Sequence, residues 1–118
     1  MKATFDMTTT EGQFKIFNAQ NGASVSLKNL DNGEIIEIEG VMQYQDVVDS
    51  YGQSQEATIT VLFGTDGTSY AGVSDTVAKA GEKLIDFMKA AALSTIKIAI
   101  VKQRSAKGQE FINLRAVM

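Results

Sequence analysis

Apolar residues in this chain recur with the period of a β-strand in several segments, and with the period of an α-helix in only one. Apolar and polar side chains alternate in four segments, which predicts strands at residues 34–44, 57–63, 96–100 and 112–116. Residues 74–93 instead carry apolar residues three or four apart, and Ser74 before them is a suitable helix N-cap. One helix therefore interrupts a run of strands.

Shorter segments complete this pattern. Residues 14–17 predict a first short strand, and residues 69–73 predict a small strand that forms a hairpin after the Asp66-Gly67 turn. Asn32-Gly33 is a second tight-turn signal, because both residues tolerate positive φ. We expect polar loops at residues 46–55 and 102–109, and a mobile terminus at residues 1–12.

This order of elements is typical of an OB-fold. We expect a mainly β protein: a five-stranded OB barrel with one helix between strands 3 and 4 and an extra small hairpin. The 118 residues are enough for a single domain, residues 1–118. The aromatic residues expected in its core are Phe14, Phe17, Phe63 and Phe87, whereas Phe111 is out of phase with its strand.

Gly40 lies inside the longest predicted strand, where a glycine suggests a bulge or a sharp bend. Simple alternation would put Tyr44 in phase with Ile36 and Ile38, on the core side. Only a bulge at Gly40 would turn Tyr44 outward.

The composition excludes much enzyme chemistry. Cysteine and histidine are both absent, which excludes disulfides, zinc sites built from these residues, and serine or cysteine nucleophiles activated by histidine. Glu37 and Glu39 share a strand face and could in principle hold a metal or act as acid and base, but a solvated strand face explains them better. We expect no enzyme activity, no cofactor and no metal. We also expect no membrane partner, because no apolar run approaches the ~20 residues that span a bilayer.

Charge is distributed unevenly along the chain. The net charge of −3 opposes nucleic-acid binding, but residues 94–118 carry five basic residues against one acidic residue. Lys102, Arg104 and Lys107 fall in the predicted loop between strands 4 and 5, which borders the binding groove of an OB-fold. These cations are candidate phosphate contacts, and an ordinary soluble hairpin tip is the alternative.

Three tyrosines occur at predicted strand ends or loops: Tyr44, Tyr51 and Tyr70. An exposed tyrosine ring can stack on a nucleobase, which is worth ~1–3 kcal/mol per base. The alternatives are half-buried residues at the rim of the core, or anchors for a protein partner in an interaction module that binds no nucleic acid.

Several short blocks resemble one known family. They are Lys2-Ala3-Thr4-Phe5-Asp6, residues 15–20, Lys28-Asn29-Leu30, Gln43-Tyr44 with Tyr51-Gly52, and Asp66-Gly67 with Tyr70 and Ser74. The chain resembles the single-stranded DNA-binding proteins of the small, phi29-like Bacillus phages that replicate by protein priming. The likeness is strongest from Lys2 to Tyr70.

The resemblance implies a function. It implies a protein that coats displaced single strands during phage DNA replication, in the cytoplasm of the bacterial host cell. It also implies base stacking by Tyr44, Tyr51 and Tyr70. Binding should tolerate any sequence, since every base has a π-face. We expect a monomer, or weak self-association on single-stranded DNA, with phage replication proteins as possible further partners.

Overall fold

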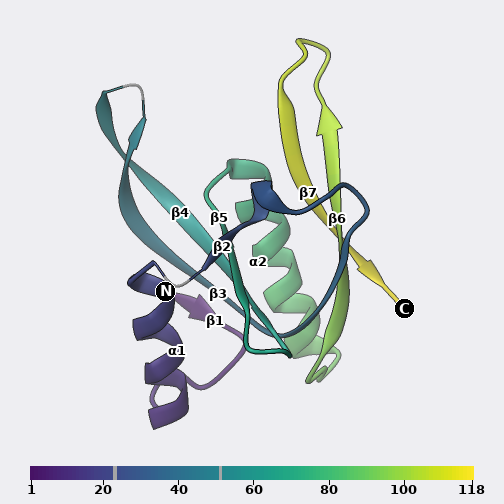
Figure 1. Ribbon diagram of the computed structural model, residues 1–118. Coiled ribbons are helices and arrows are strands. Elements are labelled where there is room, and N and C mark those ends of the chain that lie inside the picture. Colours follow the sequence, from purple (N-terminus) through teal and green to yellow (C-terminus); the bar gives the residue numbers. More distant parts are fainter. Residues whose placement is uncertain (23, 51) are drawn as a thin grey trace.

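The computed structural model describes residues 1–22, 24–50 and 52–118 (Figure 1). The elements in chain order are β1 (Lys2–Ala3), α1 (Thr10–Gln20), β2 (Val25–Ser26), the 3-10 helix η1 (Leu27–Asn29), β3 (Ile35–Ser50), β4 (Gln53–Gly64), β5 (Ser69–Gly72), α2 (Asp75–Ala90), β6 (Ile96–Arg104) and β7 (Glu110–Val117). The chain is therefore mainly β, with two α-helices in the described residues.

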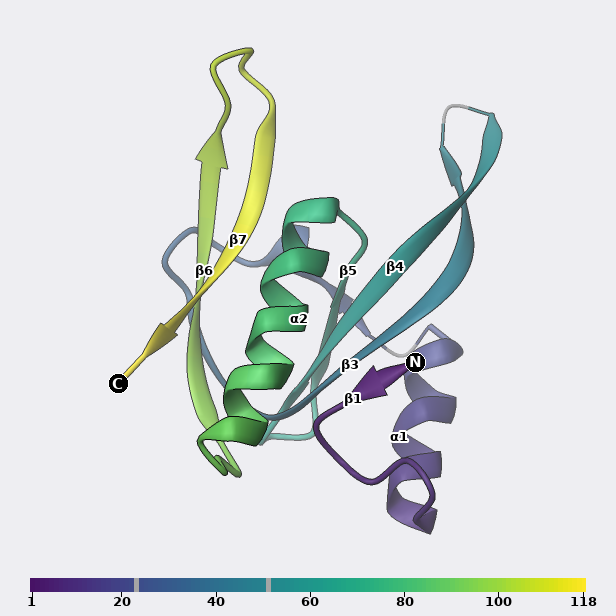
Figure 2. The same cartoon turned by 180° about the vertical axis from the view of Figure 1, so that it is seen from behind.

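The strands form one sheet. Its order is β2-β5-β4-β3-β6-β7, and β1 pairs with β3 off that path. β3 turns the sheet, because its residues 35–38 pair with β6 whereas its longer remainder pairs with β4. The sheet curls into a half-barrel (Figures 1 and 2), an arrangement consistent with an OB-like barrel.

A change of register in β3 decides which way its side chains face. The pairing with β4 shifts between Ile38 and Gly40, as at a β-bulge. Ile38, before the shift, belongs to the apolar cluster under α2, whereas Met42 and Tyr44, after it, pack with Ile59 on the opposite face. The bulge predicted at Gly40 is confirmed, and it turns Tyr44 away from the core that contains Ile38.

Apolar side chains cover both faces of the sheet. The larger cluster lies between α2 and the strands, and its most deeply buried members include Leu27, Ile38, Leu62, Val77, Ile85, Ile98 and Ile100. The smaller cluster, which includes Met42, Val61 and Phe63, lies under the N-terminal segment and α1. Phe63 is buried as predicted.

Gly81 allows α2 to approach the sheet closely. A Cβ at this position would lie 2.6 Å from Thr60 Cγ2 and 2.8 Å from Gln43 Nε2. The Gln43 amide donates to Thr60 Oγ1 at 3.0 Å and to the Ala78 carbonyl at 2.7 Å, so a buried polar contact joins the helix to β3 and β4. These bonds satisfy polar groups that would otherwise be costly to bury.

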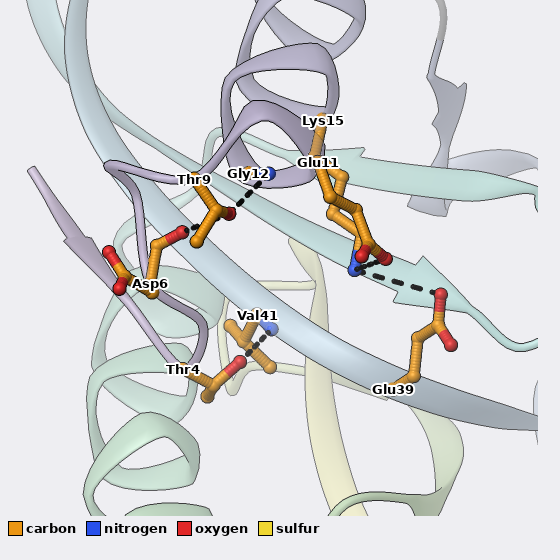
Figure 3. A network of polar contacts seen from close by, with 8 residues as sticks. All are labelled: Thr4, Asp6, Thr9, Glu11, Gly12, Lys15, Glu39 and Val41. Carbon is orange, nitrogen blue, oxygen red and sulfur yellow. Dashed lines mark hydrogen bonds and ion pairs between the residues drawn. The ribbon is translucent and has the colours of Figure 1, made fainter.

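Residues 14–17 lie in helix α1, so the strand predicted there is wrong. Thr9 caps the helix: its Oγ1 accepts the Gly12 N–H at 3.0 Å and donates to the Asp6 carbonyl at 3.1 Å (Figure 3). Four residues are too few to define a period, and the cap together with buried Ala19 favours a helix that lies on the sheet.

Because these residues form a helix, two aromatic side chains predicted in the core are exposed instead. Phe14 and Phe17 are 65% and 64% exposed, because α1 turns Ile16 and Ala19 toward the sheet instead. Phe87 is 49% exposed near the end of α2, and Phe111 is half-buried. The core assignments of Phe14, Phe17 and Phe87 are therefore wrong.

The first residues, expected to be mobile, lie against the sheet. β1 pairs with β3, and Ala3 is buried. Thr4 Oγ1 accepts the Val41 N–H at 3.0 Å (Figure 3). Lys15 of α1 pairs with Glu39 of β3 at 3.8 Å, which joins the helix to the same strand.

Residues 46–55 are mostly strand, so the polar loop predicted there is wrong. β3 continues to Ser50 and β4 begins at Gln53, and these two residues form the last pair of the ladder. Antiparallel pairing needs only backbone groups, so a two-stranded ribbon can form from mostly polar residues whose sequence shows no alternation of apolar and polar side chains. The loop predicted at residues 102–109 is shorter for the same reason, since β6 ends at Arg104 and β7 begins at Glu110.

Neither α-helix in the described residues combines the length and apolar character needed to cross a membrane.

Candidate nucleic-acid interface

Two hairpins extend from the body on the same side of the molecule, one on each side of α2 (Figures 1 and 2). The β3–β4 hairpin carries Tyr44 near its base, and Tyr51, which falls at its tip in sequence, lies outside the described residues. The β6–β7 hairpin carries Lys102, Arg104 and Lys107. The candidate residues on the described chain are thus divided between two projecting hairpins and β5, which carries Tyr70.

Tyr44 is partly buried at the edge of the smaller apolar cluster, opposite Ile59 on β4. Burial raises the pKa of its phenol, and the nearby Asp46 carboxylate raises it further. Tyr44 also lines an open groove of about 260 Å³, whose walls include Lys2 and Lys79. A side chain half in the core and half at a groove can offer part of its ring to a ligand.

Tyr70 lies on the other face of the sheet. It pairs with Leu62, and both pack with the cluster under α2. Burial raises the pKa of the Tyr70 phenol, with smaller contributions from Asp66 and Glu34. The structure therefore does not bring Tyr44 and Tyr70 together on one flat surface.

The three cations predicted to contact phosphates share one hairpin. Lys102 is held at its base: its backbone N–H donates to Asn32 Oδ1 at 2.9 Å, and its Nζ donates to the Lys28 carbonyl at 3.1 Å. Arg104 and Lys107 are exposed farther out. Among the described residues, none of the three hairpin cations has a carboxylate within 4.0 Å. Their charges remain available to an anionic partner.

Lys28 lies beside this group, although sequence reasoning gave it, with Lys15 and Arg115, only as an alternative to the hairpin cations. It occupies η1, 74 positions before Lys102 in the chain, so no spacing signal connects the two. Lys15, by contrast, is already engaged by Glu11 and Glu39, and its ammonium lies 5.2 Å from the Phe5 ring centroid. Within the described residues, Lys15 is therefore paired with carboxylates and Lys28 is not.

The acidic residues considered for catalysis are engaged with polar or charged side chains. Glu37 accepts a hydrogen bond from Thr65 at 3.2 Å, and Glu39 pairs with Lys15. In the ranges that the structure describes, no group of three or more carboxylates is placed to hold a metal ion.

Comparison with known proteins identifies the relatives of this chain. It is 47% identical over 115 residues to the single-stranded DNA-binding proteins of Bacillus phages phi29 and PZA, covering 98% of this chain and 93% of each relative. The corresponding protein of Bacillus phage B103 is 46% identical over 117 residues, covering 99% and 96%. None of these names denotes an enzyme, and no solved structure matches the chain.

A family model described as phage single-stranded DNA-binding protein matches residues 1–116. This match covers nearly the whole chain, including α1, both hairpins and α2. The resemblance noted in the short sequence blocks is confirmed, and this chain belongs to the phage single-stranded DNA-binding protein family.

Proposed function

We propose that this protein binds single-stranded DNA without sequence preference and coats strands displaced during phage DNA replication. The observation that carries the proposal is full-length relationship to proteins named for that activity. The cations on the β6–β7 hairpin, which have no carboxylate within 4.0 Å in the part of the chain that the structure describes, support it. Phosphate neutralisation supplies most of the non-specific affinity for nucleic acid.

The proposed fold is an OB-fold of residues 1–118 as a single domain. β3, β4, β5, β6 and β7 would be its five strands, with α2 between the third and fourth, while α1, β1 and β2 are additions. The hairpins that join the first to the second strand and the fourth to the fifth are then the two loops with which OB-folds bind oligonucleotides. This assignment differs from the one made on the sequence, where residues 14–17 were the first strand.

The proposed stacking residues are Tyr44, Tyr51 and Tyr70, and the proposed phosphate contacts are Lys102, Arg104 and Lys107. Tyr44 and Tyr70 pack on opposite faces of the sheet, so a strand that stacks on both must curve around the molecule. A curved path suits single-stranded DNA, whose backbone is flexible and whose bases need no duplex geometry.

We further propose that the protein acts alone or through weak self-association on DNA, without cofactor or catalysis, beside the phage replication proteins in the host cytoplasm. Its three tyrosines give a direct assay, since the chain has no tryptophan. Titration with oligo-dT should quench tyrosine emission, and added salt should weaken binding steeply. Unchanged emission at saturating DNA would contradict stacking, and no binding at low salt would contradict the function.

A further inference from the structure

The two ends of the curled sheet approach each other at a groove that no proposed contact uses. One wall comes from β2, η1 and β5, and Ile112 of β7 contributes the opposite side. Within the described residues no strand pairing links β7 to β2 or β5, so the barrel is open at this seam. The groove has a volume of about 270 Å³.

The lining of this seam groove is apolar at its floor and polar at its rim. Leu27, Val77 and Ile112 are buried beneath it. Ser26 and Ser74 lie on its rim, and each hydroxyl oxygen accepts a backbone N–H at 3.3 Å, from Lys28 and Val77 respectively. Since their oxygens accept, their hydroxyl hydrogens remain free to donate to an oxygen of a ligand.

Positive charge reaches the groove from two elements. Lys28 lines it from η1, is exposed, and has no carboxylate within 4.0 Å among the described residues. Lys102 extends toward the same turn, with its Nζ 3.1 Å from the Lys28 carbonyl. The basic β6–β7 hairpin therefore meets the edge of the groove where Lys102 contacts the Lys28 backbone.

The groove also leads to a proposed stacking residue. Ala71 and Gly72 line it from β5, and Tyr70 precedes them on the same strand. A polymer that follows the cations of the hairpin through the groove would therefore arrive at Tyr70.

We propose that the seam groove binds one nucleotide unit of the DNA strand, between the basic hairpin and Tyr70. Lys28 and Lys102 neutralise its phosphate, Ser26 and Ser74 donate to its oxygens, and its sugar or base covers the apolar floor. This proposal rests on the proposed function, since it gives a path to the same strand. It adds Lys28 as a phosphate contact and the seam as a subsite.

Lys28→Ala tests the charge. Its side chain makes no hydrogen bond within the described residues, so the variant should keep the natural melting temperature. The slope of log K against log salt for oligo-dT should become shallower by ~0.7, the value of one phosphate contact on single strands. Lys89→Ala is the matched control, because Lys89 lies in the last turn of α2, about 20 Å along the helix from the groove at 1.5 Å per residue.

Val73→Glu tests the groove itself. Val73 is 46% exposed and lines the groove, so a carboxylate there would face the bound phosphate. Val73→Gln matches it in size without the charge. Repulsion at several ångströms in water should weaken binding about threefold relative to Val73→Gln.

The outcomes separate this proposal from the function on which it rests. If the natural protein does not bind oligo-dT, both are overturned. If it binds, and the hairpin cations set the salt slope while Lys28→Ala matches Lys89→Ala and Val73→Glu matches Val73→Gln, the seam subsite is overturned and the function stands. A loss in Lys28→Ala and in Val73→Glu, absent in their controls, supports the subsite.

Discussion

Gly81→Ala probes the contact that holds α2 on the sheet. The new Cβ would lie 2.6 Å from Thr60 Cγ2 and 2.8 Å from Gln43 Nε2, closer than real Cβ atoms come to any neighbour. Thr60 is fully buried and Gln43 nearly so, which leaves neither side chain room to move into solvent. The helix must therefore shift outward, or the Gln43 amide must leave its partners.

The expected loss of stability follows from these contacts. Overpacking a core typically costs ~1–3 kcal/mol. The displaced Gln43 amide would weaken its bonds to Thr60 and to the Ala78 carbonyl, at ~1 kcal/mol each. The better helix propensity of alanine offsets ~1 kcal/mol of this. We expect a net destabilisation of about 3 kcal/mol, or a melting temperature about 12 °C lower for a domain of this size.

Thermal unfolding followed by far-UV circular dichroism measures the effect. Thr60→Ser in the Gly81→Ala background removes the methyl group that the new Cβ meets and keeps the hydroxyl that Gln43 needs, so it should restore part of the loss. Ala80→Gly, at a half-buried position of the same helix, reports the propensity difference together with the loss of one partly buried methyl group. A Gly81→Ala protein as stable as the natural one would refute the close-packing argument.

Further predictions concern the DNA site and the tyrosines. Replacing the three hairpin cations together with alanine should lower the salt slope for oligo-dT by ~2, at ~0.7 for each contact; an unchanged slope would move the phosphate path elsewhere. Tyr70→Ala and Tyr44→Ala should each weaken oligo-dT binding by ~1–3 kcal/mol in a fluorescence or gel-shift titration, and affinities equal to that of the natural protein would exclude stacking. Stability should be retained below pH ~10, where tyrosine normally ionises, and fall as the pH rises above it. The folded state raises the pKa of both Tyr44 and Tyr70, so the unfolded chain releases these protons first; denaturant midpoints that do not change between pH 9 and 11 would contradict this.

The parts of the fold that sequence patterns predicted are those with one buried face. Ser74 caps α2 as predicted, and Val77, Leu84, Ile85 and Met88 are buried against the sheet. The alternation predicted for β6 also matches the structure, because Ile98 and Ile100 are buried in the core. In these elements burial imposes the period that the sequence displays.

The elements that were mispredicted lack such a face. α1 buries only Gly12 and Ala19 and leaves Phe14 and Phe17 in solvent, so its apolar residues do not mark its packed side. The outer part of the β3–β4 hairpin is a polar ribbon that no period reveals. The polar cap at Thr9 was the available signal for α1, and Glu11 in the first turn agrees with it.

The candidate site was predicted in part. Local composition identified the basic hairpin, and the structure leaves its cations unpaired within the described residues. Tyr44 and Tyr70 lie on opposite faces of the sheet. This placement depends on how the strands pair, and the sequence alone did not predict that pairing. Lys28 was separated from Lys102 by 74 residues, and only the folded chain brings them together.

The polar β3–β4 ribbon should unfold locally, well before the rest of the domain. Tyr44 and Ile59 are the last described residues on this hairpin that pack with either core cluster, whereas Gln45, Val47 and Asp49 are exposed beyond them. Backbone hydrogen bonds without apolar cover open at a small free energy, so amide hydrogen exchange there should be fast. The amides of Val61 and Leu62, which are fully buried on a strand paired on both sides, should exchange only on global unfolding. A DNA strand that binds this hairpin must order it. The conformational entropy lost in this ordering reduces the affinity that the contacts alone would give. If DNA binding slows amide exchange in the hairpin, the size of the change would therefore measure the free energy spent on ordering the hairpin.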